Sequence, residues 1–258
     1  MPAQTSERTI AAVERAADVL SLFADGNHAS LGVTEISKEL DLSKAVVHRI
    51  LTSFRAKDFI ELDEETKRYS LGPAALALGY AYLDQIDIRA LAHSTLQMLS
   101  EESRETATLS IRSDWTRVYL EQVTPQREVK MTVEIGRPFP LHAGSSGKAF
   151  LAFLDEDERE RYLAQPELAS LTPQTQTDPV ALRSKLSEVA AKGYAVSFGE
   201  RQLGAVSIAA PILDRENHPE AVVSICGPAD RMTEKLDLAA GLLLDATHEL
   251  SRRIGHRT

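Results

Sequence analysis

Apolar residues in the first sixty positions of the chain recur with helical spacing. They predict a helix at 10–23 and two short helices within Val33–Ile60, separated by a tight turn at Asp41-Leu42. The second short helix has apolar residues at i, i+3, i+4 and i+7, namely Val47, Ile50, Leu51 and Phe54. Ser43 directly precedes this helix, and its hydroxyl can accept a backbone N–H of the first turn. The pattern therefore predicts a three-helix core whose last helix is capped by Ser43.

The next segment has the alternation of a β-hairpin. Residues Phe59–Leu62 alternate between apolar and polar positions, and Tyr69–Leu71 alternate again after a polar turn at 63–68. Two short alternating runs joined by a polar turn are typical of paired antiparallel strands. Because this hairpin directly follows the two short helices, it takes the place of the wing in a winged helix-turn-helix.

A strongly apolar helix is predicted after the hairpin. Pro73 is favourable in a first helical turn, and residues 74–80 are almost all apolar, so we expect a helix to about Asp84. Such a helix is expected to pack on more than one face. We predict a first domain at 1–72, a connecting helix at 73–85 and a second domain at 86–258.

The second domain is predicted to be α+β, with helices on the faces of a six-stranded, largely antiparallel sheet. Its short strand patterns are separated by tight turns, which favours antiparallel pairing. The expected strands are 106–112, 116–123, 129–135, 194–198, 205–213 and 221–226. The expected helices are 88–102, one capped by Ser145 or Ser146, 158–163, 180–191, and one from Thr233 to about Arg253.

The face of the second short helix opposite its apolar stripe is suited to the DNA major groove. Arginine can bind guanine through two hydrogen bonds, and lysine and serine can hold phosphate. The candidate DNA-binding residues are Ser43, Lys44, Ala45, His48, Arg49 and Thr52, with Lys67 and Arg68 of the hairpin near the phosphate backbone. The alternative interpretation is a helical hairpin with an ordinary solvated face.

Charge limits what kind of DNA binding is expected. The 258 residues carry a net charge of −9, and residues 1–80 hold nine Lys or Arg against twelve Asp or Glu. This balance argues against indiscriminate binding to nucleic acid. We therefore expect binding that depends on base sequence, with local cations and weak non-specific affinity.

The cysteine and histidine content and the length of the apolar runs argue against disulfide-rich, metal-binding and membrane proteins. The single cysteine, Cys226, excludes a disulfide framework, and the seven histidines are scattered, so neither a metal nor another cofactor is expected. No apolar run approaches the roughly 20 residues of a membrane span, and the polar start of the chain lacks the apolar core of a signal peptide. A cytoplasmic protein without a membrane partner is expected.

Several segments, in order and spacing, resemble the IclR family of transcriptional regulators over nearly the whole chain. They are VERAADVLSLF, VTEISKELDLSKAVVHRILTSF, RYSLGPAALALG, GKAFLA, GERQLGAVSIAAPI and AVVSICGP. The resemblance implies a winged helix-turn-helix, a linker helix at a dimer interface and a GAF-like effector domain. It also implies a homodimer or homotetramer that binds a palindromic operator in double-stranded DNA under control of a small metabolite.

Small hydroxyl and thiol side chains are the candidate effector site. Ser145 and Ser146 open a helix, where backbone N–H groups favour an anion. Each such residue could equally be a helix cap or a small core residue, but the resemblance implies a pocket lined by Ser145, Ser146, Ser197, Ser207, Ser224 and Cys226. Relatives that bind small 2-oxo acids have an aspartate in place of Ser197 and a cysteine in place of Ser207. With Met131 and Leu141 as apolar walls, a carboxylated or hydroxylated metabolite is expected.

Two rival classes have less support. A hydrolase could combine His142 with Ser145 or Ser146 and a distant Asp, but position 148 is Lys, so the segment is not a G-x-S-x-G elbow. No phosphate-binding loop or dinucleotide fingerprint occurs. We therefore expect no catalytic residues. A metabolite-binding module without DNA binding would leave Arg49, Lys67 and Arg68 without a function.

Overall fold

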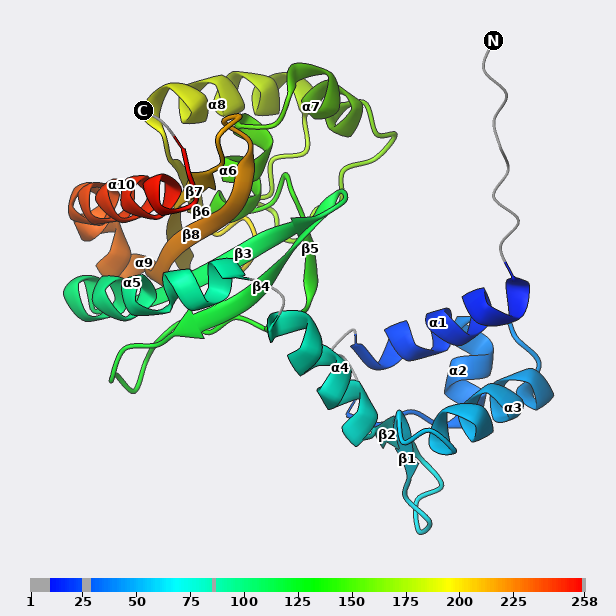
Figure 1. Ribbon diagram of the computed structural model, residues 1–258. Coiled ribbons are helices and arrows are strands. Elements are labelled where there is room, and N and C mark those ends of the chain that lie inside the picture. Colours follow the sequence, from blue (N-terminus) through cyan, green and yellow to red (C-terminus); the bar gives the residue numbers. More distant parts are fainter. Residues whose placement is uncertain (1–9, 25–28, 85–86, 257–258) are drawn as a thin grey trace. The chain divides into compact units, whose positions relative to one another are not determined.

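The computed structural model describes residues 10–24, 29–84 and 87–256 (Figure 1). The chain forms two compact units, residues 1–85 and 86–258. The boundary expected at 84–85 adjoins residues outside the described ones. No helix of the described residues has both the length and the apolar character needed to cross a membrane.

The first unit is a winged helix-turn-helix, as predicted. Its core contains Val19, Phe23, Leu31, Ile36, Val47, Leu51, Ile60 and Tyr69. The hairpin is antiparallel, with Glu61 opposite Ser70. The elements are α1 (Ala11–Ala24), α2 (Val33–Glu39), α3 (Lys44–Arg55), β1 (Ile60–Leu62), β2 (Tyr69–Leu71) and α4 (Pro73–Asp84).

Helix α1 is buried over less of its length than its sequence predicts. Val19 and Phe23 are buried, but Val13 is 61% exposed. A hollow of about 320 Å³ lies between the start of α1 and α3, bordered by Ala12 and Ile50. Only the C-terminal half of α1 closes the core.

The second unit is built on a six-stranded sheet in which every adjacent pair is antiparallel, which confirms the predicted α+β class. The strand order is β5-β4-β3-β8-β7-β6. The strands are β3 (Thr106–Ser113), β4 (Thr116–Val123), β5 (Pro138–Pro140), β6 (Ala195–Phe198), β7 (Ala205–Leu213) and β8 (Pro219–Pro228). Antiparallel pairing places alternate residues of neighbouring strands on the same face.

Helices cover both faces of this sheet (Figure 1). On one face lie α5 (Asp87–Ser103) and α10 (Leu236–Arg253), which contact each other and strands β3 and β7. On the other face lie α6 (Ser145–Ala152), α7 (Glu156–Leu163) and α8 (Pro179–Lys192), packed on a core that includes Ala209 and Val222. A short α9 (Ala229–Met232) and a 3-10 turn (Thr233–Lys235) precede α10, so Thr233 does not cap the last helix.

The strand predicted at 129–135 is wrong. The third strand of the six-stranded sheet, in chain order, is β5 (Pro138–Pro140). Within the described residues 129–135, only Ile135 forms an isolated β-bridge, which pairs it with Tyr119. Side chains of the neighbouring strands bind this segment in place of a backbone ladder. Gln122 exchanges two 2.9 Å hydrogen bonds with the backbone of Val133, and Thr106 donates to the Met131 carbonyl over 2.5 Å.

The start of α6 also differs from the prediction. Gly144, at φ +86°, is the N-cap, and Ser145 and Ser146 are the first helical residues. Every residue of α6 is buried. A Cβ on Gly147 would lie 2.2 Å from the Leu141 carbonyl oxygen, so only glycine permits this approach. The close packing holds the start of α6 against the sheet.

Candidate functional site

Helix α3 presents the predicted DNA-binding face to solvent. The Ser43 hydroxyl accepts the Val46 N–H over 3.3 Å, which confirms the predicted cap. Val47 and Leu51 are fully buried, so the helix is fixed by its apolar side. The exposed residues on and before the helix include Ser43, Lys44, Ala45, His48, Arg49 and Thr52.

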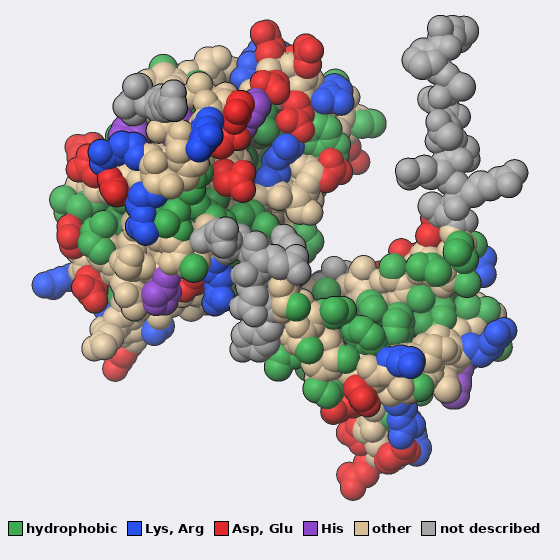
Figure 2. Space-filling view, viewed as in Figure 1, with side chains coloured by type: hydrophobic (Ala, Val, Ile, Leu, Met, Phe, Trp, Pro, Cys, Tyr) green, Lys and Arg blue, Asp and Glu red, His purple; other side chains and the backbone are tan. Residues whose placement is uncertain are grey.

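The β1–β2 hairpin carries several carboxylates, which are unfavourable in a wing that contacts phosphate. Glu64 accepts hydrogen bonds from Arg55 over 3.0 Å and from Lys67 over 2.9 Å. Asp63 accepts the backbone N–H groups of Glu65 and Thr66, which fixes the turn. Figure 2 shows acidic side chains gathered at the tip of this hairpin. Lys67 therefore reaches solvent beside carboxylates.

Arg68 is held inside the winged domain. Its guanidinium donates to the Ser30 hydroxyl over 2.9 Å, to the Ser30 carbonyl over 2.8 Å, and to both carboxylate oxygens of Glu35 over 3.1 and 2.8 Å. These contacts join β2 to the start of α2. Unlike the other candidate DNA-binding residues, Arg68 is half-buried and tied to the fold.

In the second unit, the six predicted serine and cysteine residues surround one cavity. Ser197 pairs with Ser207, and Ser207 with Cys226, in the registers of β6, β7 and β8. The Ser145 hydroxyl donates to Ser207 Oγ over 2.7 Å, which joins α6 to this row. The residues that line the cavity include Ser145, Ser146, Ser197, Ser207, Ser224 and Cys226.

The cavity has a volume of about 20 Å³. A single water molecule needs roughly 10–15 Å³, so the cavity has room for little more than one water molecule. The loop between β6 and β7 contributes Arg201 and Gln202 to the lining. Gly199 and Gly204 flank this loop at φ +71° and +75°.

Arg117 is one of the cavity residues that the sequence analysis did not identify. It lies on β4, is 1% exposed, and its guanidinium carbon is 4.6 Å from the centre of the Tyr119 ring. Its Nε and Nη1 atoms have no hydrogen-bond partner among the described residues. Arg201 approaches the Phe139 ring to 5.3 Å from the edge of the same cavity. The sequence does contain a pattern that indicates this position: Arg117 and Tyr119 are two residues apart in a strand, so their side chains lie on the same face.

A buried ion pair between Lys148 and Glu200 lies next to the cavity. Lys148 of α6 is 2% exposed, pairs with Glu200 and donates to the Val196 carbonyl over 3.0 Å. Glu200 also accepts the Gly144 N–H over 3.1 Å. Burial lowers the pKa of Lys148, and the Glu200 carboxylate opposes that change. The pair fixes the start of α6 relative to the β6–β7 loop.

His142 does not form the triad considered above. Its Nδ1 lies 2.8 Å from the Tyr162 hydroxyl, and its Nε2 lies 2.8 Å from the Ala169 carbonyl. Burial lowers the pKa of His142, so the ring is neutral at pH 7. Both ring nitrogens therefore serve the fold and leave none for Ser145 or Ser146.

The two predicted apolar walls lie elsewhere. Leu141 is fully buried in the core beneath α6, and Met131 lies in the segment bound by Thr106. Neither lines the cavity, whose aromatic wall is Tyr119. Burial raises the pKa of the Cys226 thiol to about 11, so this side chain is a neutral thiol at pH 7.

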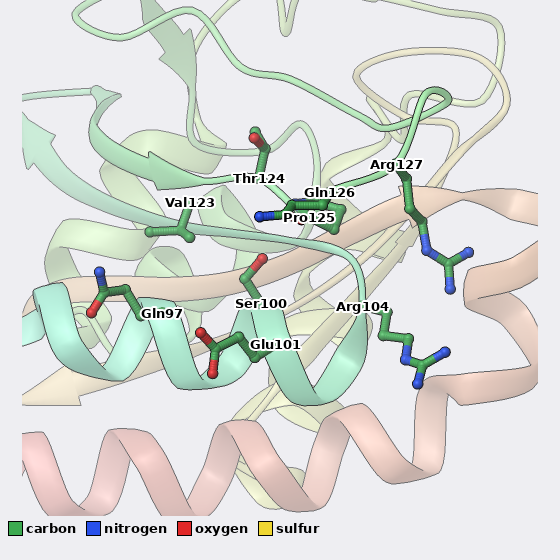
Figure 3. Close-up of a pocket in the computed structure, with 9 residues that line it drawn as sticks. All are labelled: Gln97, Ser100, Glu101, Arg104, Val123, Thr124, Pro125, Gln126 and Arg127. Carbon is green, nitrogen blue, oxygen red and sulfur yellow. The ribbon is translucent and has the colours of Figure 1, made fainter.

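A larger hollow of about 520 Å³ lies between α5 and the end of β4. Figure 3 shows Arg104 and Arg127 at one end of it and Gln97 at the other. Its buried hydroxyl, on Ser100, already donates to the Glu105 carbonyl over 2.9 Å. Because no buried polar group there lacks a partner among the described residues, the smaller cavity is the better candidate effector site.

Both units match known sequence families. Residues 12–64 match the family model described as "IclR helix-turn-helix domain". Residues 80–252 match the one described as "Bacterial transcriptional regulator IclR C-terminal". The two matches cover both predicted functional parts of the chain.

Full-length relatives agree with these matches. The HTH-type transcriptional regulator BhcR of Paracoccus denitrificans is 34% identical over 94% of this chain and 86% of that protein. The transcriptional repressor IclR of Escherichia coli is 29% identical over 95% and 90%. The crystal structure of a regulator of this type from Alicyclobacillus acidocaldarius has a TM-score of 0.86 at 30% identity, covering 96% of this chain and 100% of that one.

These relatives are transcriptional regulators and not enzymes, which confirms the predicted class. The winged domain is thus a DNA-binding domain, and the second unit is an effector domain. The chain belongs to the IclR family of bacterial transcriptional regulators.

Proposed function

We propose that this regulator binds a palindromic operator and that a small carboxylated or hydroxylated metabolite in the effector cavity changes its affinity for that operator. The observation that carries the effector part is the convergence of six small polar side chains, from α6 and three strands, on one cavity. Hydroxyls both donate and accept hydrogen bonds, so they suit carboxylate and hydroxyl groups of a ligand.

The DNA contact in this proposal is the exposed face of α3. Arg49 reads a base edge in the major groove, and Lys44 and Ser43 bind phosphate at the start of the helix. Ala45, His48 and Thr52 complete the face. Lys67 contacts the phosphate backbone from the hairpin, whereas Arg68 orients the hairpin through Ser30 and Glu35.

Recognition of a palindrome requires two copies of the chain, and α4 supports that requirement. Leu76 and Leu78 are 63% and 60% exposed on a helix without charged residues before Asp84. Covering two such side chains with a second copy removes apolar surface from water. We propose that the chain forms a homodimer through α4, either alone or as half of a homotetramer made of two such dimers.

Effector and operator must affect each other's binding by the same factor, because coupling between two equilibria is reciprocal. In this proposal α4, which joins the two domains along the chain, transmits the change. A ligand that lowers operator affinity must therefore bind less tightly to the operator complex.

Selection of bound DNA tests the proposal. Purified protein is mixed with genomic fragments, and retained fragments are sequenced and then used as duplex probes in mobility-shift titrations. We expect a shared palindrome, lost in the Arg49→Ala variant and kept in the control Lys38→Ala on α2, which is exposed but outside the proposed face. Retention of no fragment above a scrambled duplex would leave a metabolite-binding module as the better description.

A further inference from the structure

Arg117 is a buried cation without a counter-ion. It is 1% exposed, and no carboxylate lies within ion-pair distance of it in the described part of the chain. The aromatic faces of Tyr119 and Phe139, at 4.6 and 5.5 Å, provide only partial compensation. A buried guanidinium with unpartnered Nε and Nη1 is unfavourable unless an anion joins it.

The start of α6 adds to the same positive potential. The first N–H groups of a helix have no intrahelical acceptor and carry partial positive charge. The ideal Cβ position of Gly144, the N-cap, is 3.6 Å from Arg117 Nη2 and 3.7 Å from Arg201 Cβ. The Arg117 guanidinium and the base of the Arg201 side chain therefore lie beside the positive end of this helix.

The nearby carboxylate does not neutralise this charge. Glu200 lines the cavity but is paired with the buried Lys148, so that pair is neutral as a whole. Glu105, the other buried acid of this region, is paired with Arg231 and Lys235. Among the described residues, no carboxylate forms an ion pair with Arg117 or Arg201.

From this arrangement we propose that Arg117 selects the charge of the effector, and that the effector is a small dicarboxylate. One carboxylate binds the Arg117 guanidinium at the start of α6, and the second binds Arg201. This inference rests on the effector cavity of the proposed function and narrows its ligand from polar metabolites in general to dianions. The small cavity favours short chains, and the serine hydroxyls accommodate substituents between the two carboxylates.

Matched acids and amides test the charge requirement without any mutation. Malonate and succinate are compared with malonamide and succinamide, with acetate as a monoanion and inorganic phosphate as a competing anion, at constant ionic strength. We expect the dicarboxylates to raise the melting temperature of the wild-type protein, acetate to raise it less and the diamides not at all. Equal responses to acids and amides, no response to any dicarboxylate, or a larger response to phosphate would each overturn the proposal.

Variants then assign the response to residues. Arg117→Gln should weaken dicarboxylate binding by about 10- to 100-fold in calorimetric titrations, since a charged hydrogen-bonding partner is lost. Its melting temperature without ligand should equal or exceed that of the wild type, because an unpaired buried charge is removed. Arg201→Gln should lose less affinity. Arg137→Gln is the matched control, because Arg137 lies 5.4 Å from the Phe139 ring but does not line the cavity.

Operator binding separates this inference from the proposed function. Without ligand, the Arg117→Gln protein should bind the operator in mobility-shift titrations with the same affinity as the wild type. Adding the dicarboxylate should no longer change that affinity. An Arg117→Gln protein that responds to dicarboxylate like wild type would contradict the assignment even if operator binding is established. Failure of the wild type to bind DNA would contradict the proposed function and leave the ligand result standing.

Discussion

Lys148 and Glu200 form an ion pair in which the lysine, on α6, is 2% exposed and the glutamate, on the β6–β7 loop, is 12% exposed. The pair links α6, whose first residues line the cavity, to the β6–β7 loop, which lines it as well. Because two buried charges need each other, loss of either partner leaves an uncompensated charge in the interior.

Glu200→Gln is therefore expected to lower the free energy of unfolding by about 3–5 kcal/mol, since Lys148 would stay buried without a counter-ion. Urea denaturation at pH 7 measures this change. The double variant Lys148→Met/Glu200→Gln should recover a large part of the loss. A Glu200→Gln protein as stable as wild type would mean that water or another group compensates Lys148.

Arg49→Ala is expected to weaken operator binding by about 1–3 kcal/mol if the side chain reads a base. Its exposed position, opposite the buried Val47 and Leu51, means that the fold should be retained. Mobility shifts with operator and scrambled duplexes measure the effect. The same loss on both duplexes would make Arg49 a phosphate contact, and no loss on either would remove it from the interface.

Leu78→Glu is expected to convert the oligomer to monomers, because a charge would replace an apolar contact at the proposed α4 interface. Sedimentation velocity at micromolar concentration measures the mass. Val180→Glu on α8 is the control, since Val180 is 70% exposed and outside α4. A monomeric wild type, or an oligomeric Leu78→Glu protein, would contradict the interface.

Cys226 is expected to be inert to thiol reagents in the folded protein. Burial raises its pKa from 9.0 to about 11, although Arg201 and Arg117 oppose the shift. At pH 8 a disulfide reagent should label it slowly in the native state and rapidly in denaturant. Rapid native labelling would show that the cavity opens readily.

The same shift gives a pH dependence of stability. Between pH 9 and about 11 the folded thiol keeps its proton while the unfolded thiol loses it. The contribution of Cys226 to the free energy of unfolding is therefore fully present below pH 9 and decreases as the pH rises towards about 11. Cys226→Ser should flatten the decline of the unfolding free energy in that range. An identical decline in both proteins would assign it to other groups.

Sequence patterns predicted the elements that depend on local chemistry. The stripe through Val47 and Leu51 and the cap at Ser43 gave α3 its correct start and buried side. The convergence of Ser197, Ser207 and Cys226 came from the family resemblance, because strand register depends on pairing partners that are distant in sequence.

The errors have a common cause in tertiary contacts. Residues 129–135 have the pattern of a strand, but Gln122 satisfies the backbone of Val133 with its side chain. Arg117 looks like a solvent-facing residue of an alternating strand until the sheet places that face beneath α6. No local rule distinguishes an arginine that faces water from one that faces a cavity.

The acidic hairpin has a kinetic consequence. Glu64 already binds Arg55 and Lys67, and Asp63 and Glu65 stand on the same turn. Near a duplex these carboxylates are repelled by phosphates and offset much of the attraction of Lys67, so the hairpin adds little affinity for DNA of unrelated sequence. We expect short dwell times on unrelated DNA, with a search that proceeds by repeated dissociation through solution more than by sliding along the duplex.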